Sequence, residues 1–137
     1  MTTQTILLAS WQKAHTKLMS IYGEDITVTR NTETLDADGQ ITGVSTTSDT
    51  GVNVRISPLS EEDREFLGIG IITTGSQKMI TNPSYDLSNL GNSFSFENGD
   101  IITTADSVEH MVSKLIRKFS IGDTEVCRTF LIKRVDT

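Results

Sequence analysis

The stretch "DITVTRNTETLDADGQITGVST", residues 25–46, decides the fold because two β-prone segments meet at an Asp-Gly pair. On its first side Ile26 and Val28 alternate with threonines, and this period of two indicates a β-strand. Asp38-Gly39 between two such segments is a strong signal for a tight hairpin turn. The sequence therefore predicts two antiparallel strands joined near residue 38.

Closely spaced aspartates, such as Asp36 and Asp38, also occur in calcium-binding loops of the EF-hand kind. Such a loop needs glycine at its sixth position and usually glutamate at its twelfth. Counted from Asp36, those positions hold Ile41 and Thr47, and the glycine comes two places early at Gly39. We therefore interpret the segment as a turn, with calcium binding as a minor alternative, and predict no metal and no cofactor.

Upstream of the hairpin, apolar residues recur at steps of four and three, which is the spacing of one helix face. They are Leu7, Trp11, Ala14, Leu18 and Ile21. We predict an amphipathic helix over residues 1–23 that ends near Gly23. Its apolar stripe, anchored by Trp11 and Tyr22, is expected to cover its own domain, with docking on a neighbour as the alternative.

Downstream, strands are predicted at 41–47, 51–57, 69–73, 78–81, 101–104 and 125–135. Gly51 is expected to open the second of these strands, and Pro58 to end it. A helix of about two turns is expected after Ser60, because Ser60 and Asp63 have capping-box spacing and Gly68 can end it. Residues 82–98 read as a loop that carries five large apolar side chains, and such a loop either packs down or orders on a partner.

Residues 108–119 fit two structures. Their apolar residues recur at helical spacing, and Asp106 with Glu109 has capping-box spacing, which favours a helix. Gly122-Asp123 followed by a clear strand instead favours a hairpin with the preceding segment. We predict a strand for residues 110–119.

The chain has 137 residues, 36% of them hydrophobic, which is enough to bury one modest core. We therefore predict a single domain, residues 1–137, of an N-terminal helix (1–23) and a mainly β body (24–137) built as a small antiparallel barrel or sandwich. The net charge of -6 disfavours gripping nucleic acid, but it suits DNA passing along a non-adhesive acidic wall. No membrane span and no secretory signal are evident, so we expect synthesis in the cytoplasm.

Residues for catalysis do not occur in recognisable groups. His15 and His110 have no second His or Cys at metal-ligand spacing, and both are expected to be structural or solvated. The single cysteine, Cys127, cannot form an intramolecular disulfide and is expected to be a small buried hydrophobe. We therefore predict that the protein is not an enzyme.

Six of the twelve basic residues lie in the last quarter of the chain, whereas acidic residues dominate the rest. They are Lys114, Arg117, Lys118, Arg128, Lys133 and Arg134. A solvated face of the terminal hairpin is the simpler interpretation. The alternative is that these residues, with Trp11, form an assembly face, since subunits with basic and acidic sides associate head to tail.

The chain resembles the head-closure proteins of tailed bacteriophages, also called stoppers or head-tail joining proteins. The resemblance rests on the order of elements and on four segments: "DITVTRNTETLDADGQI", "VNVRISPLSEEDREFLGIG", "NGDIITTADSVEHMV" and "FLIKRV" at 130–135. Two features depart from the family: the helix at 5–22 is longer than expected, and 108–119 has unusually helical spacing.

The resemblance implies a small β-barrel in a virion neck, assembled as a ring of six or twelve copies. The ring would lie between the portal or adaptor and the tail tube or tail terminator, and DNA would pass through its channel. By this analogy the loops 36–51 and 82–98 are candidate channel or docking loops. The residues implicated are Asp36, Asp38, Gly39, Tyr85, Asp86, Leu87, Leu90, Phe94 and Phe96. Alternatives are a tail terminator, a minor tail protein or a small OB-like binding domain.

Overall fold

A computed structural model of the protein describes residues 3–67 and 76–135. Its elements, in chain order, are α1 (Thr3–Tyr22), β1 (Glu24–Leu35), β2 (Ile41–Ser57), α2 (Glu61–Leu67), β3 (Ser76–Thr81), β4 (Tyr85–Leu87), β5 (Gly91–Phe94), β6 (Ile101–Thr103), β7 (Glu109–Ile121) and β8 (Thr124–Arg134). The predicted mainly β class, with an N-terminal helix and a short connecting helix, is confirmed. The predictions of a strand at 69–73 and of Gly68 as a helix end lie outside the described residues.

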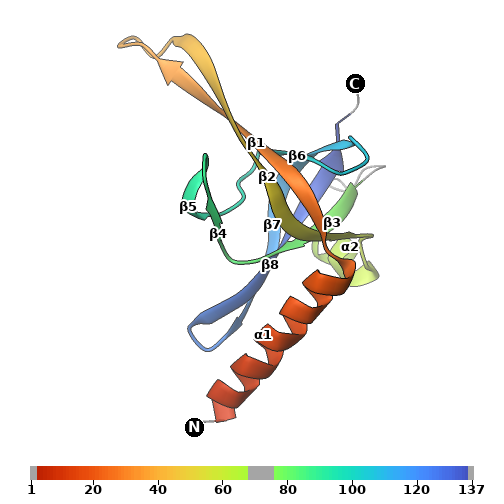
Figure 1. Ribbon diagram of the computed structural model, residues 1–137. Helices are drawn as coiled ribbons and strands as arrows, with labels where there is room; N and C mark the ends of the chain where they lie inside the picture. Colours follow the sequence, from red (N-terminus) through yellow and green to blue (C-terminus); the bar gives the residue numbers. More distant parts are fainter. Residues whose placement is uncertain (1–2, 68–75, 136–137) are drawn as a thin grey trace.

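Six strands pair in a closed antiparallel cycle, in the order β1, β2, β3, β8, β7, β6 and back to β1. The cycle is irregular, because the β1–β2 and β7–β8 ladders both contain register shifts. β4 and β5 form a separate two-stranded sheet beside it (Figure 1). The closing ladders are only three residues long, so much of β1, β2 and β7 has a partner strand on one side alone.

The first hairpin extends well beyond the barrel. β6 pairs only with Thr27–Thr29 of β1, and β3 pairs only with Arg55–Ser57 of β2. The ladder between β1 and β2 nevertheless continues to Leu35 and Ile41. Its outer part therefore leaves the barrel as a two-stranded ribbon, residues 31–46, which we call the arm (Figure 1).

The predicted turn at the end of the arm is confirmed. Asp36 Oδ1 accepts hydrogen bonds from the backbone N–H groups of Asp38 and Gln40, both at 2.9 Å. Gly39 has φ +82°, a left-handed conformation that glycine adopts without strain. The carboxylate of Asp36 is thus used to shape the turn.

The prediction of a long loop over 36–51 is wrong, and so is a separate strand starting at Gly51. Residues 41–57 form one strand, and Gly51, at φ +70°, lies in a bulge within it. Opposite this bulge, Ile26 pairs with Val52 while Val28 pairs with Asp49, so β2 contains one extra residue. The sequence predicted that Gly51 opens a new strand, whereas in the structure Gly51 bends a continuous strand at the base of the arm.

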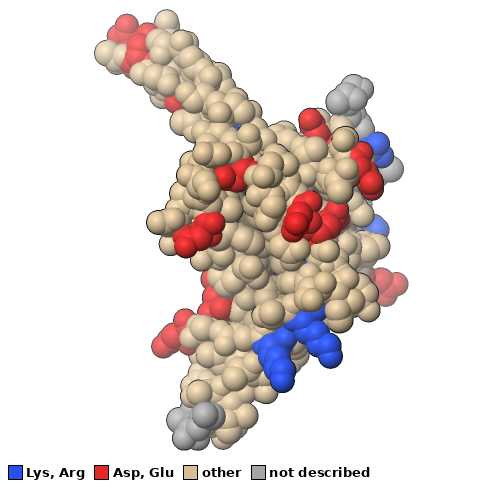
Figure 2. All heavy atoms as spheres, in the orientation of Figure 1, with Lys and Arg blue, Asp and Glu red and all other residues tan. Residues whose placement is uncertain are grey.

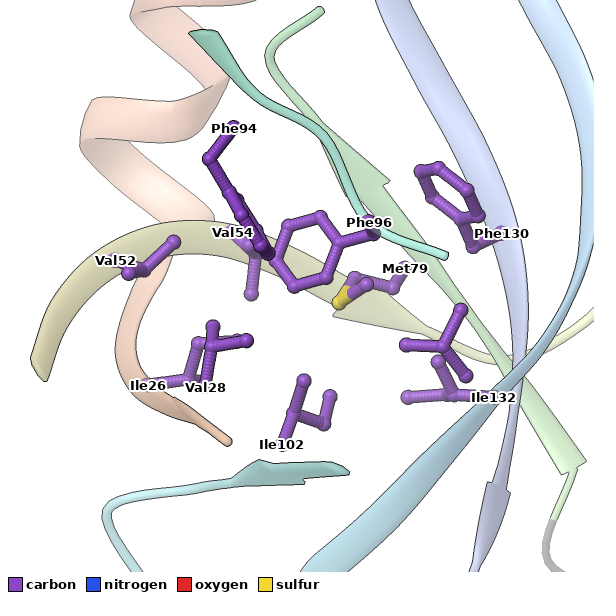
Figure 3. Close-up of a cluster of buried hydrophobic side chains, with 11 residues drawn as sticks. Ile26, Val28, Val52, Val54, Met79, Phe94, Phe96, Ile102, Phe130 and Ile132 are labelled. Atoms are coloured by element: carbon purple, nitrogen blue, oxygen red, sulfur yellow. The ribbon is translucent and has the colours of Figure 1, made fainter. Parts of the chain in front are cut away.

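The core fills the barrel and takes two phenylalanines from outside the six strands (Figure 3). Its buried members are Ile26, Val28, Val52, Val54, Met79, Phe94, Phe96, Ile102, Val112, Phe130 and Ile132. Phe96 packs edge-on against Phe94 and Phe130, with ring centroids 5.2 and 5.9 Å apart. The apolar loop predicted at 82–98 therefore packs down, and its β4–β5 sheet closes one side of the core.

Residues 109–121 form the strand β7, as predicted for 110–119. The helical spacing of their apolar residues has a local cause. Register shifts between Val112 and Lys114 and between Leu115 and Arg117 interrupt the alternation of sides. Buried residues then fall at 110, 112 and 116, which is a mixture of steps of two and four. The bulges therefore make a strand resemble a helix in sequence.

Helix α2 begins with the predicted capping box. Asp63 Oδ2 accepts hydrogen bonds from the backbone N and Oγ of Ser60, at 3.0 and 2.8 Å. The same carboxylate, fully buried, forms ion pairs with Lys78 and Arg117. Burial by itself raises the pKa of Asp63, but the hydrogen bonds of Ser60 and Lys78 outweigh it and lower this pKa to about 2. Asp63 thus joins α2 to two barrel strands.

Candidate assembly surfaces

Helix α1 lies against β8, β2 and β7 but leaves much of its apolar stripe in solvent. The helix ends as predicted: Gly23 N donates to Met19 O, and a Cβ on Gly23 would collide with that oxygen. Met19 is the one buried side chain among its described residues. Trp11 stacks edge-on against Phe119 of β7 with centroids 5.1 Å apart, yet stays 47% exposed. The expectation that the stripe covers its own domain is therefore only partly met.

A groove of about 240 Å³ runs between α1 and the barrel. Apolar groups dominate its lining, including Trp11, Leu18 and Phe119. His15, at one side, hydrogen-bonds Asn82 Oδ1 at 2.8 Å. The groove is thus a small, open apolar hollow, at which the Trp11 ring of the helix contacts the Phe119 ring of the barrel edge-on.

The sequence did not predict that Arg55 and Cys127 lie in the groove. Arg55, on the outer side of β2, has a buried Nε that makes no hydrogen bond with any described residue. Cys127 also lines the groove and is half-buried, so the expected buried cysteine is in fact partly accessible. Burial raises the pKa of the Cys127 thiol, and nearby Arg55 partly opposes this shift. The alternation of side chains along β2 indicates that Arg55 points outward from the barrel. It does not indicate that α1 covers this position.

The arm combines apolar and acidic side chains, and every residue from 31 to 46 is exposed. Leu35, Ile41 and Val44 are 58–61% exposed. Asp36, Asp38 and Gly39, predicted as loop residues, lie at its tip, and Figure 2 shows acidic atoms gathered there. The arm therefore offers a narrow ribbon with both an apolar and a negative character.

The predicted basic assembly residues do not all gather in one place. They follow the whole β7–β8 ladder, from Lys114 to Arg134. Arg117 is paired with Asp63, and Arg128 with Glu125, within the same chain. Lys118 lies opposite Arg128, and the carboxylate of Glu125 offsets that repulsion. Four of the six, Lys114, Arg117, Lys118 and Arg134, are exposed, and their part in assembly stays a prediction.

Residues 82–98 are held firmly against the barrel. Asp49 Oδ2 accepts a hydrogen bond from Leu90 N at 2.7 Å, and both of its oxygens lie 3.1 Å from Asn89 N. The hydroxyl of Tyr85 donates to the carbonyl of Asn53 at 2.6 Å. Arg30 caps the segment by lying 4.6 Å above the ring of Phe94. This loop is therefore an anchored part of the body.

Because this loop is buried, the prediction that Phe94 and Phe96 are docking residues is wrong. Phe94 and Phe96 are 4% and 5% exposed, so they serve the core and are not available to a partner in the folded chain. Tyr85, Leu87 and Leu90 are half-buried against the same core. Asp86 is exposed, and it remains the candidate whose side chain faces solvent.

Replacing Asp49 with alanine is expected to loosen this anchor. The N–H groups of Asn89 and Leu90 would lose a charged acceptor, which costs about 1–2 kcal/mol locally. Hydrogen exchange should therefore speed up at these two amides while the barrel amides keep their protection. Asp86→Ala, at an exposed position of the same segment, is the matched control. Unchanged exchange at both amides in the Asp49 variant would contradict the anchoring role.

One polar cavity opens at an end of the barrel, where Glu24, Gln77 and Arg134 surround His110. His110 is 6% exposed, and its Nδ1 has no hydrogen-bond partner in the described residues. Burial, together with Arg134, lowers the pKa of His110. Within 3–67 and 76–135, no cluster of three or more His, Cys, Asp or Glu side chains could hold a metal ion. None of the described helices combines the length and apolar character needed to cross a membrane.

Comparison of the chain with protein-family models, with curated proteins and with solved structures gave no match.

Proposed function

We propose that the protein is a structural component of a tailed-phage neck, which assembles as a ring between the portal or adaptor and the tail and closes the DNA-filled head. Support comes from the resemblance of the four segments quoted above and from the small irregular barrel that they form. The observation that carries the proposal is the arm, a projecting ribbon with exposed Leu35, Ile41 and Val44. A lone two-stranded ribbon of this kind is marginally stable in water, so it is suited to contact a neighbour.

In this role the chain would act by contact and by charge rather than by catalysis. A ring of six or twelve copies with net charge -6 each would surround the channel with negative potential. DNA could then slide past without adhering to the wall. The ring would be made in the host cytoplasm and retained in the virion neck, with no membrane involved.

Among the alternatives, the OB-like binding domain is disfavoured by the position of the aromatic rings. Such domains present aromatics on exposed strands for base stacking. Here Phe94, Phe96 and Phe130 are buried in the core. A tail terminator or minor tail protein would use the same kinds of surface and remains the second candidate.

Deletion of residues 84–95 is not a clean test of the proposal, because these residues contribute to the core. The deletion removes Phe94 from the core and releases Asp49 from its partners. Shortening the arm is better, because residues 33–44 are exposed and their removal leaves the core intact. An Asn-Gly turn joining Thr32 to Ser45 would close the shortened hairpin.

The experiment uses an infection in which the gene for this chain is disrupted. The proposal predicts DNA-filled heads and separate tails, with DNA leaking from the heads. Adding the purified full chain should restore joined, infectious particles, whereas the arm-shortened chain should restore less than about one hundredth of them. Normal particle yield without the chain would overturn the proposal. Circular dichroism of the shortened chain, matching the full chain apart from the lost ribbon, is the folding control.

A further inference from the structure

A layer of mostly polar side chains lies above the apolar core at one end of the barrel. Along each barrel strand, the alternation of sides that buries the core residues continues for one more inward position. These six positions line the polar cavity, which has a volume of about 480 Å³: Glu24, Ile56, Gln77, Thr104, His110 and Arg134. Of the six, only His110 is buried, and it lies two residues before Val112 of the core.

The surroundings of His110 favour its neutral form. Its Nδ1 is buried and has no hydrogen-bond partner within 3–67 and 76–135. In an imidazolium both ring nitrogens carry protons, so the charged form would place an unsatisfied N–H donor beside the apolar core. Arg134 lies opposite His110 in the β7–β8 ladder and has the same charge as an imidazolium. Burial, and secondly Arg134, therefore lower the pKa of His110 below its ordinary value of 6.5.

Charged groups reach the cavity from three elements. They are Arg134 of β8, Glu24 of β1 and Asp106 in the turn between β6 and β7. The cavity-lining residues that β2 and β3 contribute in the described part of the chain are uncharged. Asp106 is exposed and Glu24 is only half-buried, so water screens their attraction for an imidazolium. The carboxylates therefore do not reverse the effect of burial on His110.

Strand β6 is held by the shortest ladders of the barrel. It consists of Ile101–Thr103 and pairs with β1 and with β7 at three positions each. β7 pairs with β8 at ten positions. Ile102 lies directly opposite His110. Among the described pairings, separation of β6 from β7 therefore breaks the fewest pairs that keep the imidazole from water.

The turn that joins β6 to β7 adopts a strained backbone. Ser107 has φ +64°, a left-handed conformation that is unfavourable for a residue with a side chain. The turn is closed by two backbone hydrogen bonds, from Thr104 N to Val108 O at 3.0 Å and from Ser107 N to Thr104 O at 2.9 Å. Separation of the two strands would release this strain, which lowers the cost of opening at this place.

We propose that His110 is a pH-sensitive latch of the barrel: once its imidazole gains a proton, β6 separates from β7 and this end of the barrel opens. The imidazolium then reaches water, while the long β7–β8 ladder holds the remaining strands. Separation also uncovers Ile102 and Val112, which are fully buried in the closed barrel. The latch acts within a single chain, so it does not depend on the proposed neck assembly.

The direction of the pH dependence follows from the burial of His110. Above pH 6.5 the imidazole is neutral in the closed and in the open barrel, and the barrel is closed. Below pH 6.5 the open form takes up a proton while the closed form does not, because the pKa of His110 is lowered only in the closed barrel. The population of the open form should therefore rise by up to about tenfold per pH unit until the lowered pKa is reached.

Amide hydrogen exchange of the full chain at pH 7.5 and pH 5.5, followed by NMR, tests the latch. Two amides report on the contact between β6 and β7: Val112 N donates to Asp100 O at 2.8 Å, and Thr104 N donates to Val108 O. Their protection factors, which correct for intrinsic exchange, should fall by about three- to tenfold at pH 5.5. Amides of the β3–β8 ladder should keep their protection factors within about twofold.

The two histidines of the chain provide a matched pair of variants. His110→Gln keeps a polar side chain but cannot titrate, so the pH effect at Val112 and Thr104 should disappear. His15→Gln removes the histidine beside α1 and should leave the pH effect unchanged. Arg134→Gln removes the like charge opposite His110 and should reduce the pH effect.

A measurement on the wild-type chain keeps the inference testable if His110→Gln does not fold. The ring protons of His110 should titrate below pH 6.5, and their NMR signals are the ones that remain in His15→Gln. Titration of His110 at or above pH 6.5 overturns the inference. It is equally overturned if the pH effect persists in His110→Gln, or if acid speeds exchange to the same extent throughout the barrel.

Discussion

Replacing Phe96 with alanine is expected to lower the free energy of unfolding by about 4 kcal/mol. Phe96 is 5% exposed, and its ring packs against those of Tyr85, Phe94 and Phe130 at 5.2–6.0 Å. The substitution removes all three ring contacts and leaves a cavity that the irregular segment 82–98 must collapse to fill. Urea titration followed by circular dichroism measures the loss.

Tyr22→Ala is the matched control for this prediction. Tyr22 is an aromatic residue of α1 that is 66% exposed, so its removal should change the free energy of unfolding by less than about 0.5 kcal/mol. A loss below about 1 kcal/mol for Phe96→Ala would mean that 82–98 does not belong to the core. The alternative from the sequence, a free loop that orders on a partner, would then hold for this segment.

Asp63→Ala is expected to cost about 3 kcal/mol, for a different reason. The fully buried carboxylate of Asp63 accepts hydrogen bonds from Ser60 and forms ion pairs with Lys78 and Arg117. Its removal takes away the carboxylate half of the capping box and leaves two cations without their partner. Both cations keep some access to water, so the cost lies at the lower end for a broken buried pair. Glu62→Ala, at an exposed position of the same helix, should be nearly neutral.

The pH dependence provides a second measurement on Asp63. The folded pKa of about 2 lies below the ordinary value of 3.8, so the carboxylate stabilises the fold above pH 3.8. This contribution is lost as the pH falls towards 2. The difference in unfolding free energy between wild type and Asp63→Asn should therefore be largest near pH 6 and shrink steadily on acidification. A difference that stays constant down to pH 2.5 would contradict the assignment.

Local signals allowed much of the fold to be predicted. Period-two alternation around Ile26 and Val28, and the Asp38-Gly39 turn, depend on backbone geometry that neighbouring residues determine. The capping box of Ser60 and Asp63 is similarly local. The elements that these signals predicted all occur at their expected places.

The remaining features depend on contacts between distant segments. The phenylalanines of 82–98 are core residues because Asp49, forty positions away, holds the loop on the barrel. The groove exists because α1 approaches β2 and β7, a relation that no spacing in the sequence encodes. The arm was missed because Gly51 was interpreted as a strand boundary. A glycine in a bulge and a glycine in a turn are alike in sequence, and only pairing partners distinguish them.

The bulge at Gly51 also determines the direction in which the two-stranded ribbon leaves the barrel. β2 accommodates one extra residue where the ribbon leaves the body, and this single insertion fixes the angle at which the ribbon points outward. In a closed ring of identical copies, the angle between one copy and the next determines how many copies complete the circle. In the ring proposed above, one added or deleted residue at this place would change the direction of the ribbon and, where the ribbon contacts a neighbour, the number of copies that complete the circle.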